Sequence, residues 1–175
     1  VAPKCLEEVE LLLKWSFEKN APVAIRYPRG GDIVDDIKPL KEIKEGKWEL
    51  IHKGSKVCII ATGKMVQHAK LAMDMMYERG LNPTLINATF IKPIDTELII
   101  KAAKETKAIV TAEEHSIIGG LGSAVSEVVS ENCPTIVKKV GINDCFGESG
   151  TPSELLEKYG LTAKHIVEKV KEALN

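Results

Sequence analysis

Residues 57–63 of the chain read VCIIATG, an apolar run rich in β-branched side chains that is closed by a turn. Because polar residues do not alternate with apolar ones here, the run predicts a strand that is buried on both faces, as in parallel sheets covered by helices. Residues 65–79 continue with apolar side chains at helical spacing, and Gly80 suits the positive φ that often ends a helix. Together these residues predict a unit of strand, turn and helix.

The same alternation of strands and helices continues to the end of the chain. Apolar runs predict further strands at residues 83–87, 108–112 and 135–140. Helices are predicted after Asp95 as an N-cap, over 123–131, over 153–158, and from Thr162 as a second cap to Leu174. We therefore predict an α/β fold over residues 56–175, a three-layer α/β/α domain with a mostly parallel sheet.

Residues 1–30 are predicted to be the end of another domain. Apolar residues at helical spacing predict a helix over 5–19, and residues 22–28, PVAIRYP, predict a strand between two prolines. One helix and one strand cannot bury both of their faces, so further strands are expected upstream. Because residue 1 is Val and no secretion signal follows it, we expect the chain to have been cut from a longer one.

Residues 31–55 are predicted to be a linker between these two units. Glycine, aspartate and lysine dominate the segment, and its apolar positions are scattered. A short strand around Trp48, within residues 43–51, is left open as an alternative.

The composition excludes several classes of partner. The 175 residues carry 24 Lys and Arg against 25 Asp and Glu, so neither nucleic acid nor an anionic membrane is expected as a partner. The apolar runs are far shorter than the roughly 20 residues of a membrane-spanning helix. The four cysteines stand far apart without a CxxC pair, which predicts reduced thiols in the cytoplasm and no thiolate metal site.

A glycine-rich loop follows the predicted strand 108–112, at the edge where open parallel sheets bind their ligands. Its candidate residues are Glu114 and His115, after Glu113, and the glycines Gly119, Gly120 and Gly122. The glycines form neither GxGxxG nor a phosphate loop ending in GKS or GKT, so no dinucleotide or ATP site is predicted. We instead expect a tight turn that serves as a subunit contact, or that leaves helix N–H groups free to contact an anion.

The titratable residues do not predict a catalytic centre. Neighbouring residues of an extended segment point to opposite faces, so at most two of Glu113, Glu114 and His115 can converge as acid, base or metal ligand. The other histidines, His52, His68 and His165, are expected to be solvated at the surface. Cys58 is expected in the core, and Cys145 has no neighbouring base that would activate its thiol.

Arg26 and Arg29 are candidate ligands for an anion. They flank Tyr27 and Pro28 at the end of the predicted strand 22–28, and a guanidinium offers a planar set of donors that suits a phosphate. The alternative is an ion pair with the acidic side chains just downstream, which are Asp32, Asp35 and Asp36. The residues alone leave both readings open.

Four segments together resemble a known family. They are PVAIRYPRG at residues 22–30, IIATG at 59–63, FIKPID at 90–95 and AEEHSIIGGLGSA at 112–124. Over nearly the entire chain the sequence resembles the C-terminal part of transketolase-type thiamine diphosphate enzymes, and the RYPRG and FIKPID segments are most similar to the 1-deoxy-D-xylulose-5-phosphate synthase family. The tail FGESGTPSELLEKYGL at 146–161 is more similar to the C-terminal subunit of split transketolases, so the two assignments compete.

The resemblance implies an enzyme several times longer than this chain. The first assignment implies a transferase that joins pyruvate to glyceraldehyde 3-phosphate with loss of carbon dioxide, a step toward isoprenoid and thiamine precursors. The second implies transfer of a two-carbon ketol unit between sugar phosphates. Either implies that residues 1–30 end a pyrimidine-binding domain and that residues 56–175 form a C-terminal domain, which packs against other domains and in a homodimer. A freestanding α/β binding or assembly module is the alternative outside the enzymes.

The resemblance also implies roles for individual residues. The family holds thiamine diphosphate and Mg²⁺ through a Gly-Asp-Gly motif and a later asparagine, whereas here Gly31 and Asp32 are followed by Ile33, a chance look-alike. The glutamate that contacts the pyrimidine ring has no counterpart either, so we expect no catalytic, cofactor-binding or metal-binding residue and no activity of this chain alone. In that family, an arginine of the segment that matches RYPRG binds the phosphate of the sugar substrate. The resemblance therefore implies Arg29 as the first candidate for this contact and Arg26 as the second.

Overall fold

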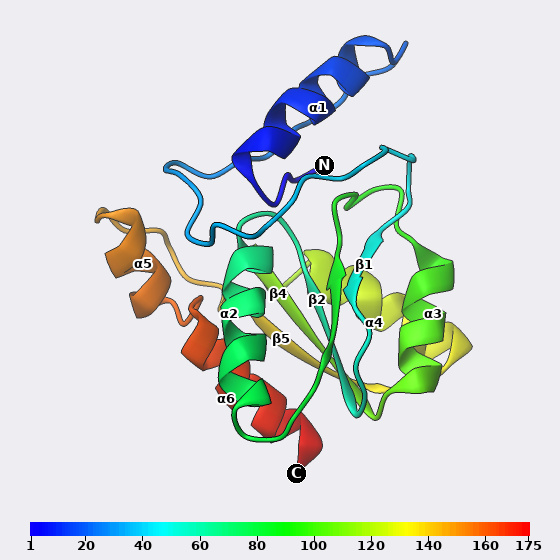
Figure 1. Cartoon of the computed structure of the whole chain (residues 1–175), viewed down its shortest axis with the longest axis vertical. Coiled ribbons are helices and arrows are strands. Elements are labelled where there is room, and N and C mark those ends of the chain that lie inside the picture. Colours follow the sequence, from blue (N-terminus) through cyan, green and yellow to red (C-terminus); the bar gives the residue numbers. More distant parts are fainter.

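The computed structural model describes all 175 residues and shows a five-stranded sheet between two layers of helices (Figure 1). The strand order is β1-β3-β2-β4-β5, and every neighbouring pair is parallel except the antiparallel pair of β1 and β3. The strands are β1 Glu49–His52, β2 Val57–Ala61, β3 Thr84–Asn87, β4 Ala108–Ser116 and β5 Ile136–Ile142. The predicted α/β fold with a mostly parallel sheet is therefore confirmed.

Alternate side chains of β2 enter two separate cores, one on each face of the sheet. Val57 and Ile59 pack with α2 (Met65–Tyr77) and α6 (Ala163–Leu174), whereas Cys58 and Ile60 pack with α3 (Thr96–Glu105) and α4 (Leu121–Asn132). All four side chains are fully buried. This two-sided burial explains why β2 is apolar throughout, and it confirms the expected core position of Cys58. No helix of the structure has both the length and the apolar character that crossing a bilayer requires.

Two helices begin at side-chain caps. Asp95 caps α3 as predicted, because its carboxylate accepts a hydrogen bond from the N–H of Leu98 at 3.2 Å. The short helix α5 (Pro152–Lys158) begins with a capping box formed by Thr151 and Glu154. Thr162 stands at the N-cap position of α6, but its hydroxyl contacts the ring of His165 at 2.8 Å instead of a backbone N–H.

The predicted strand over residues 22–28 is wrong, because the segment is extended but belongs to no sheet. Its backbone pairs only with Val1, whose ammonium donates to the carbonyl of Ala24 at 2.8 Å and whose carbonyl accepts the N–H of Arg26 at 2.9 Å. Two hydrogen bonds to a single residue do not form the ladder of a β-sheet. The residue types favour a strand, but no neighbouring strand is present to pair with them. The helix predicted over residues 5–19 does form, as α1 (Leu6–Phe17).

The sheet also takes in residues 49–52, which lie in the segment 31–55 predicted as a linker. β1 pairs with β3 at the edge of the sheet and buries its side chains only in part. Just before it, the buried Trp48 donates its indole N–H to the carbonyl of Phe90 at 2.7 Å and its backbone N–H to Asp95 at 3.0 Å. The structure thus adopts the alternative of a short strand beside Trp48.

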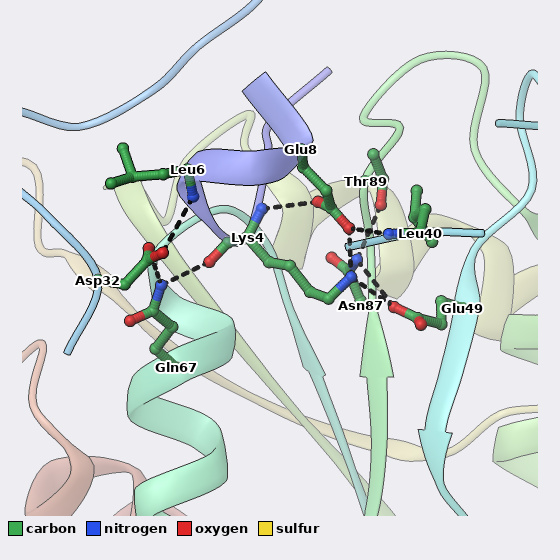
Figure 2. Close-up of polar contacts among 9 residues, drawn as sticks. All are labelled: Lys4, Leu6, Glu8, Asp32, Leu40, Glu49, Gln67, Asn87 and Thr89. Carbon is green, nitrogen blue, oxygen red and sulfur yellow. Dashed lines mark hydrogen bonds and ion pairs between the residues drawn. The ribbon is translucent and has the colours of Figure 1, made fainter. Parts of the chain in front are cut away.

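A buried polar cluster fastens the N-terminal residues to the sheet (Figure 2). We call it the Lys4 cluster, and it consists of Lys4, Glu8, Glu49 and Asn87. The Lys4 ammonium forms ion pairs with Glu8 and, at 2.9 Å, with Glu49, and the side chains of Lys4 and Glu8 are almost fully buried. Glu8 also accepts the backbone N–H groups of Lys4 at 2.9 Å and Leu40 at 3.0 Å. The buried charges of Lys4 and Glu8 therefore neutralise each other, as burial requires.

Asp32 and Gln67 tie the segment after residue 30 to the same region (Figure 2). One oxygen of Asp32 accepts the N–H of Leu6 at 3.1 Å, and the other accepts the side-chain amide of Gln67 at 2.7 Å. The same amide donates to the carbonyl of Lys4 at 2.7 Å. The segment predicted as a linker is thus bonded both to α2 and to the first residue of α1.

His68 is buried on α2, so the prediction of a solvated histidine is wrong at this position. Burial, with a smaller effect of the Lys64 charge, lowers the pKa of His68 to about 4. The helix is enclosed because α6 packs on it and because Ile33 and Asp36 bond to its polar side chains. His52 and His165 are half-buried and contact the side chains of Asn82 and Thr162.

Candidate functional site

The carboxyl ends of β2, β4 and β5 open onto a cleft of about 470 Å³, which we call the arginine cleft. Its lining combines residues 26–29, the turn after β2, Glu114 of β4 and side chains of α5. A second hollow of about 450 Å³, the α1 groove, lies between α1 and the loop after β4 and includes His115. Arg26 lines both, so the two hollows adjoin at the edge of the sheet where open α/β folds bind ligands.

The turn after β2 fixes one wall of the arginine cleft. Thr62 donates its N–H to the carbonyl of Ala112 at 3.1 Å and its hydroxyl to the carbonyl of Ala88 at 2.8 Å. Gly63 then adopts a φ of +57°, a conformation that favours glycine. The chain thereby enters α2 at Lys64, which is only 8% exposed and lines the cleft.

Arg26 and Arg29 both line the arginine cleft without an acidic partner. Two of the three acidic side chains downstream are engaged elsewhere, since Asp36 pairs with Lys70 at 2.8 Å and Asp32 bonds to Leu6 and Gln67, and Asp35 forms no ion pair with either arginine. Arg26 donates to the carbonyl oxygen of Glu114, a neutral acceptor. The alternative of ion pairs with the acidic segment is thus not formed, and both guanidiniums keep their charge available to a ligand.

The arginine cleft carries a surplus of positive charge. Burial raises the pKa of Glu114, while the charges of Arg26 and Lys64 oppose that rise. Glu148, the other carboxylate of the lining, is paired with Lys158 at 2.6 Å. Two arginines and one lysine therefore face a single unpaired carboxylate, which makes this cleft attractive to anions.

The glycine-rich loop holds a carboxylate of the chain itself. Glu113 is buried, and its carboxylate accepts the N–H groups of Leu121 at 2.6 Å and Gly122 at 2.8 Å at the start of α4. Burial raises the pKa of Glu113, and these two hydrogen bonds oppose the rise. The N–H groups expected to be free for an external anion are thus occupied. A subunit contact stays a prediction for Gly119, Gly120 and Gly122.

The three titratable residues at the end of β4 do not converge. Glu114 lines the arginine cleft, whereas Glu113 and His115 line the α1 groove, as expected for alternating side chains of a strand. His115 is exposed, and its ring contacts only the carbonyl of Ser116 at 3.1 Å. For Glu114 and His115 the interface role stays a prediction as well.

Lys64 is the candidate that the sequence analysis missed. The sequence did contain a signal for it, because Lys64 stands at the N-cap position of α2. Ser, Thr, Asp or Asn is favoured at this position, and the positive end of the helix dipole disfavours a cation there. Nothing in the sequence, however, indicates that this lysine would be buried beside Arg26 and Arg29.

Asp32 and the other side chains that could bind a metal ion do not form a cluster. No three His, Cys, Asp or Glu side chains gather in an arrangement that could hold a metal ion. Asp32, which stands in the Gly-Asp look-alike, has both carboxylate oxygens bonded to Leu6 and Gln67. Mg²⁺ binds oxygen ligands in octahedral geometry, and the Asp32 carboxylate is already engaged by two donors of the protein.

Comparison with known proteins covers nearly the whole chain. Residues 46–166 match the family described as transketolase, C-terminal domain. A 1-deoxy-D-xylulose-5-phosphate synthase of Clostridium beijerinckii is 53% identical over 167 residues, which are 95% of this chain and 27% of that protein. A protein of the same name from Clostridium botulinum is 46% identical over 162 residues, 92% of this chain and 26% of its own length. The chain thus spans about a quarter of the length of these curated relatives.

One solved structure is similar over nearly the same extent. It is described as a split gene transketolase, an inactive beta4 tetramer, and it is 45% identical with a TM-score of 0.87. The match covers 93% of this chain and 53% of that chain.

Proposed function

Because the chain belongs to the transketolase C-terminal domain family, we propose that it serves as the C-terminal part of a 1-deoxy-D-xylulose-5-phosphate synthase. The identity of 53% over 95% of the chain to a protein of that name carries the proposal. The whole enzyme would join pyruvate to glyceraldehyde 3-phosphate and release carbon dioxide. Thiamine diphosphate with Mg²⁺ would supply the carbon–carbon chemistry, held by residues outside this chain.

The proposed role of this chain is to hold the phosphate of the aldehyde substrate. Arg29, together with Arg26, lines the arginine cleft without an acidic partner. A guanidinium can bind two phosphate oxygens through two parallel N–H bonds. Fixing the phosphate orients the aldehyde at the other end of the substrate, and such orientation lowers the barrier to the reaction.

The other parts of the chain are proposed to hold the assembly together. Residues 1–30 would be the end of the pyrimidine-binding domain, and residues 56–175 would be the C-terminal domain. Residues 31–55 would connect the two and contribute strand β1 to the sheet of the C-terminal domain. The exposed Ile118, beside the glycine-rich turn, suits a contact with another domain or with the second subunit of a homodimer. The four unpaired cysteines fit a reducing cytoplasm.

A transketolase is the second candidate. The similarity to a split gene transketolase, 45% identical over 93% of this chain, favours it. Such an enzyme would transfer a two-carbon ketol unit between sugar phosphates, and the arginine cleft would again hold a phosphate. The two candidates therefore differ in the donor substrate and agree on the role of the arginines.

In the whole enzyme, Arg29→Ala is expected to raise the KM for glyceraldehyde 3-phosphate by about tenfold to a hundredfold, because a charged hydrogen-bond partner of the phosphate is lost. The KM for pyruvate, which carries no phosphate, is expected to stay unchanged. Steady-state kinetics with each substrate varied in turn measures both values. Arg79→Ala removes the exposed arginine just after α2 and is the control. An equal rise in both KM values, or no rise, would contradict a phosphate contact of Arg29.

A further inference from the structure

Lys64 has a largely buried side chain whose ammonium has no partner in the chain. It is 8% exposed, yet its ammonium forms no hydrogen bond and no ion pair with the rest of the chain. Lys4, the other buried lysine, lies instead between two carboxylates. The Lys64 ammonium is not among the buried polar atoms that lack a partner, so the packed stem holds a solvent-accessible cation whose donors are left for water or for a ligand.

The position of Lys64 at the start of α2 is unfavourable for a positive charge. The first turn of α2 contains no acidic residue, and no side chain caps the helix. The positive end of the helix dipole therefore lies next to a positive side chain. Such a conflict between a residue and its local structure is typical of a functional position.

The Lys64 side chain reaches the segment that carries both arginines. It lines the arginine cleft with Arg26 and Arg29, and a Cβ built on Gly30 would lie 3.8 Å from the Lys64 ammonium nitrogen. Three cations thus face one cleft, in which Glu114 is the single carboxylate without an ion pair. This leaves a surplus of two positive charges.

We propose that Lys64 is a third ligand for phosphate in the arginine cleft, acting beside Arg26 and Arg29 on a phosphomonoester dianion. The inference rests on the proposed function, which places a phosphorylated substrate in this cleft. A surplus of two positive charges matches a dianion better than it matches the single charge of a carboxylate such as pyruvate. The cleft volume of about 470 Å³ also falls within the roughly 300–1,000 Å³ typical of small-molecule sites.

Calorimetric titration of the chain with inorganic phosphate, at fixed pH and ionic strength, tests this contact. Lys64→Met keeps a long side chain without the charge, and it is expected to raise the Kd for phosphate by about tenfold or more. Lys64→Arg restores the charge and is expected to keep most of the affinity. Lys101→Met removes an exposed lysine of α3, so it loses the same charge far from the cleft and is expected to bind like the wild type.

Thermal unfolding separates a ligand role from a structural one. Without phosphate, Lys64→Met is expected to have the same Tm as the wild type or a higher one, because Met keeps the packed stem and removes a cation from the positive end of α2. With phosphate, the wild type and Lys101→Met are expected to gain stability, whereas Lys64→Met gains little. A lower Tm of Lys64→Met without phosphate would show that Lys64 supports the fold and would overturn the proposal.

The binding measurements can also overturn the proposed role of Lys64. Equal Kd values for the wild type and Lys64→Met, or no phosphate binding by the wild type, would overturn the proposal. Pyruvate is titrated in parallel, and an equal dependence of its binding on Lys64 would show that the site does not select phosphate. If only the synthase proposal were wrong, the results would differ from these. Phosphate binding would still depend on Lys64, but the whole enzyme would release no carbon dioxide from pyruvate.

Discussion

Lys4→Met is expected to lower the free energy of unfolding by about 3–5 kcal/mol, because it leaves the buried carboxylate of Glu8 without its cation. The Glu8 side chain is 0% exposed, and Glu49 lies 2.9 Å from the same ammonium (Figure 2). Without Lys4, the fully buried Glu8 carboxylate would lose its cation and keep the negative charge of the partly exposed Glu49 nearby. Urea-induced unfolding followed by circular dichroism measures the change in stability.

Lys14→Met is the matched control for Lys4→Met. Lys14 pairs with Glu10 at 2.5 Å and at the same sequence spacing, but both side chains are largely exposed. Removal of an exposed pair of this kind is expected to cost only about 0.5 kcal/mol. Adding Glu8→Leu to Lys4→Met is expected to recover part of the lost stability, because the unpaired buried charge disappears. Similar losses for the variants of Lys4 and Lys14 would contradict the role given to the Lys4 cluster.

Gly120→Ala is expected to lower the free energy of unfolding by about 3 kcal/mol, because the added methyl group has no room. A Cβ at this position would overlap the Glu113 carboxylate and lie 2.6 Å from the carbonyl oxygen of Ser116. Glu113 cannot retreat without losing its hydrogen bonds to Leu121 and Gly122. Thermal or urea-induced unfolding of the purified variant measures the loss.

Gly31→Ala serves as the control for Gly120→Ala. A Cβ on Gly31 would meet no atom within 4 Å, and the φ of Gly31 is not positive. Its effect is expected to stay within about 0.5 kcal/mol, as for most surface substitutions. If Gly120→Ala were as stable as Gly31→Ala, the close packing of the glycine-rich loop against Glu113 would be disproved.

The elements packed on both faces of the sheet were predictable because their patterns are local. β2 is apolar along its whole length, and Asp95 before an apolar periodic run marks the start of α3. β1 is harder to recognise, because its side chains are only partly buried and its partner β3 lies far along the chain. The strand predicted over 22–28 failed for the related reason that no strand lies beside it.

Arg26 and Arg29 could be singled out from the sequence, but their surroundings could not. Guanidinium geometry left a phosphate ligand and an ion pair with the acidic segment equally open, and only the family resemblance favoured the phosphate. The choice between a ligand and an acidic partner depends on Lys70 and Gln67, which engage Asp36 and Asp32 from another element. The burial of Lys64 likewise depends on how residues 26–31 pack over the start of α2, which no local pattern encodes.

Release of carbon dioxide from pyruvate tests the central proposal most directly. The enzyme assembled from this chain and the proposed thiamine-diphosphate-binding part is supplied with pyruvate and glyceraldehyde 3-phosphate, and carbon dioxide and sugar phosphate products are measured together. We predict carbon dioxide in an amount equal to the pyruvate consumed, with a matching amount of a five-carbon deoxysugar phosphate. Transfer of a two-carbon unit from a ketose phosphate, with pyruvate left untouched and no carbon dioxide released, would contradict the synthase assignment.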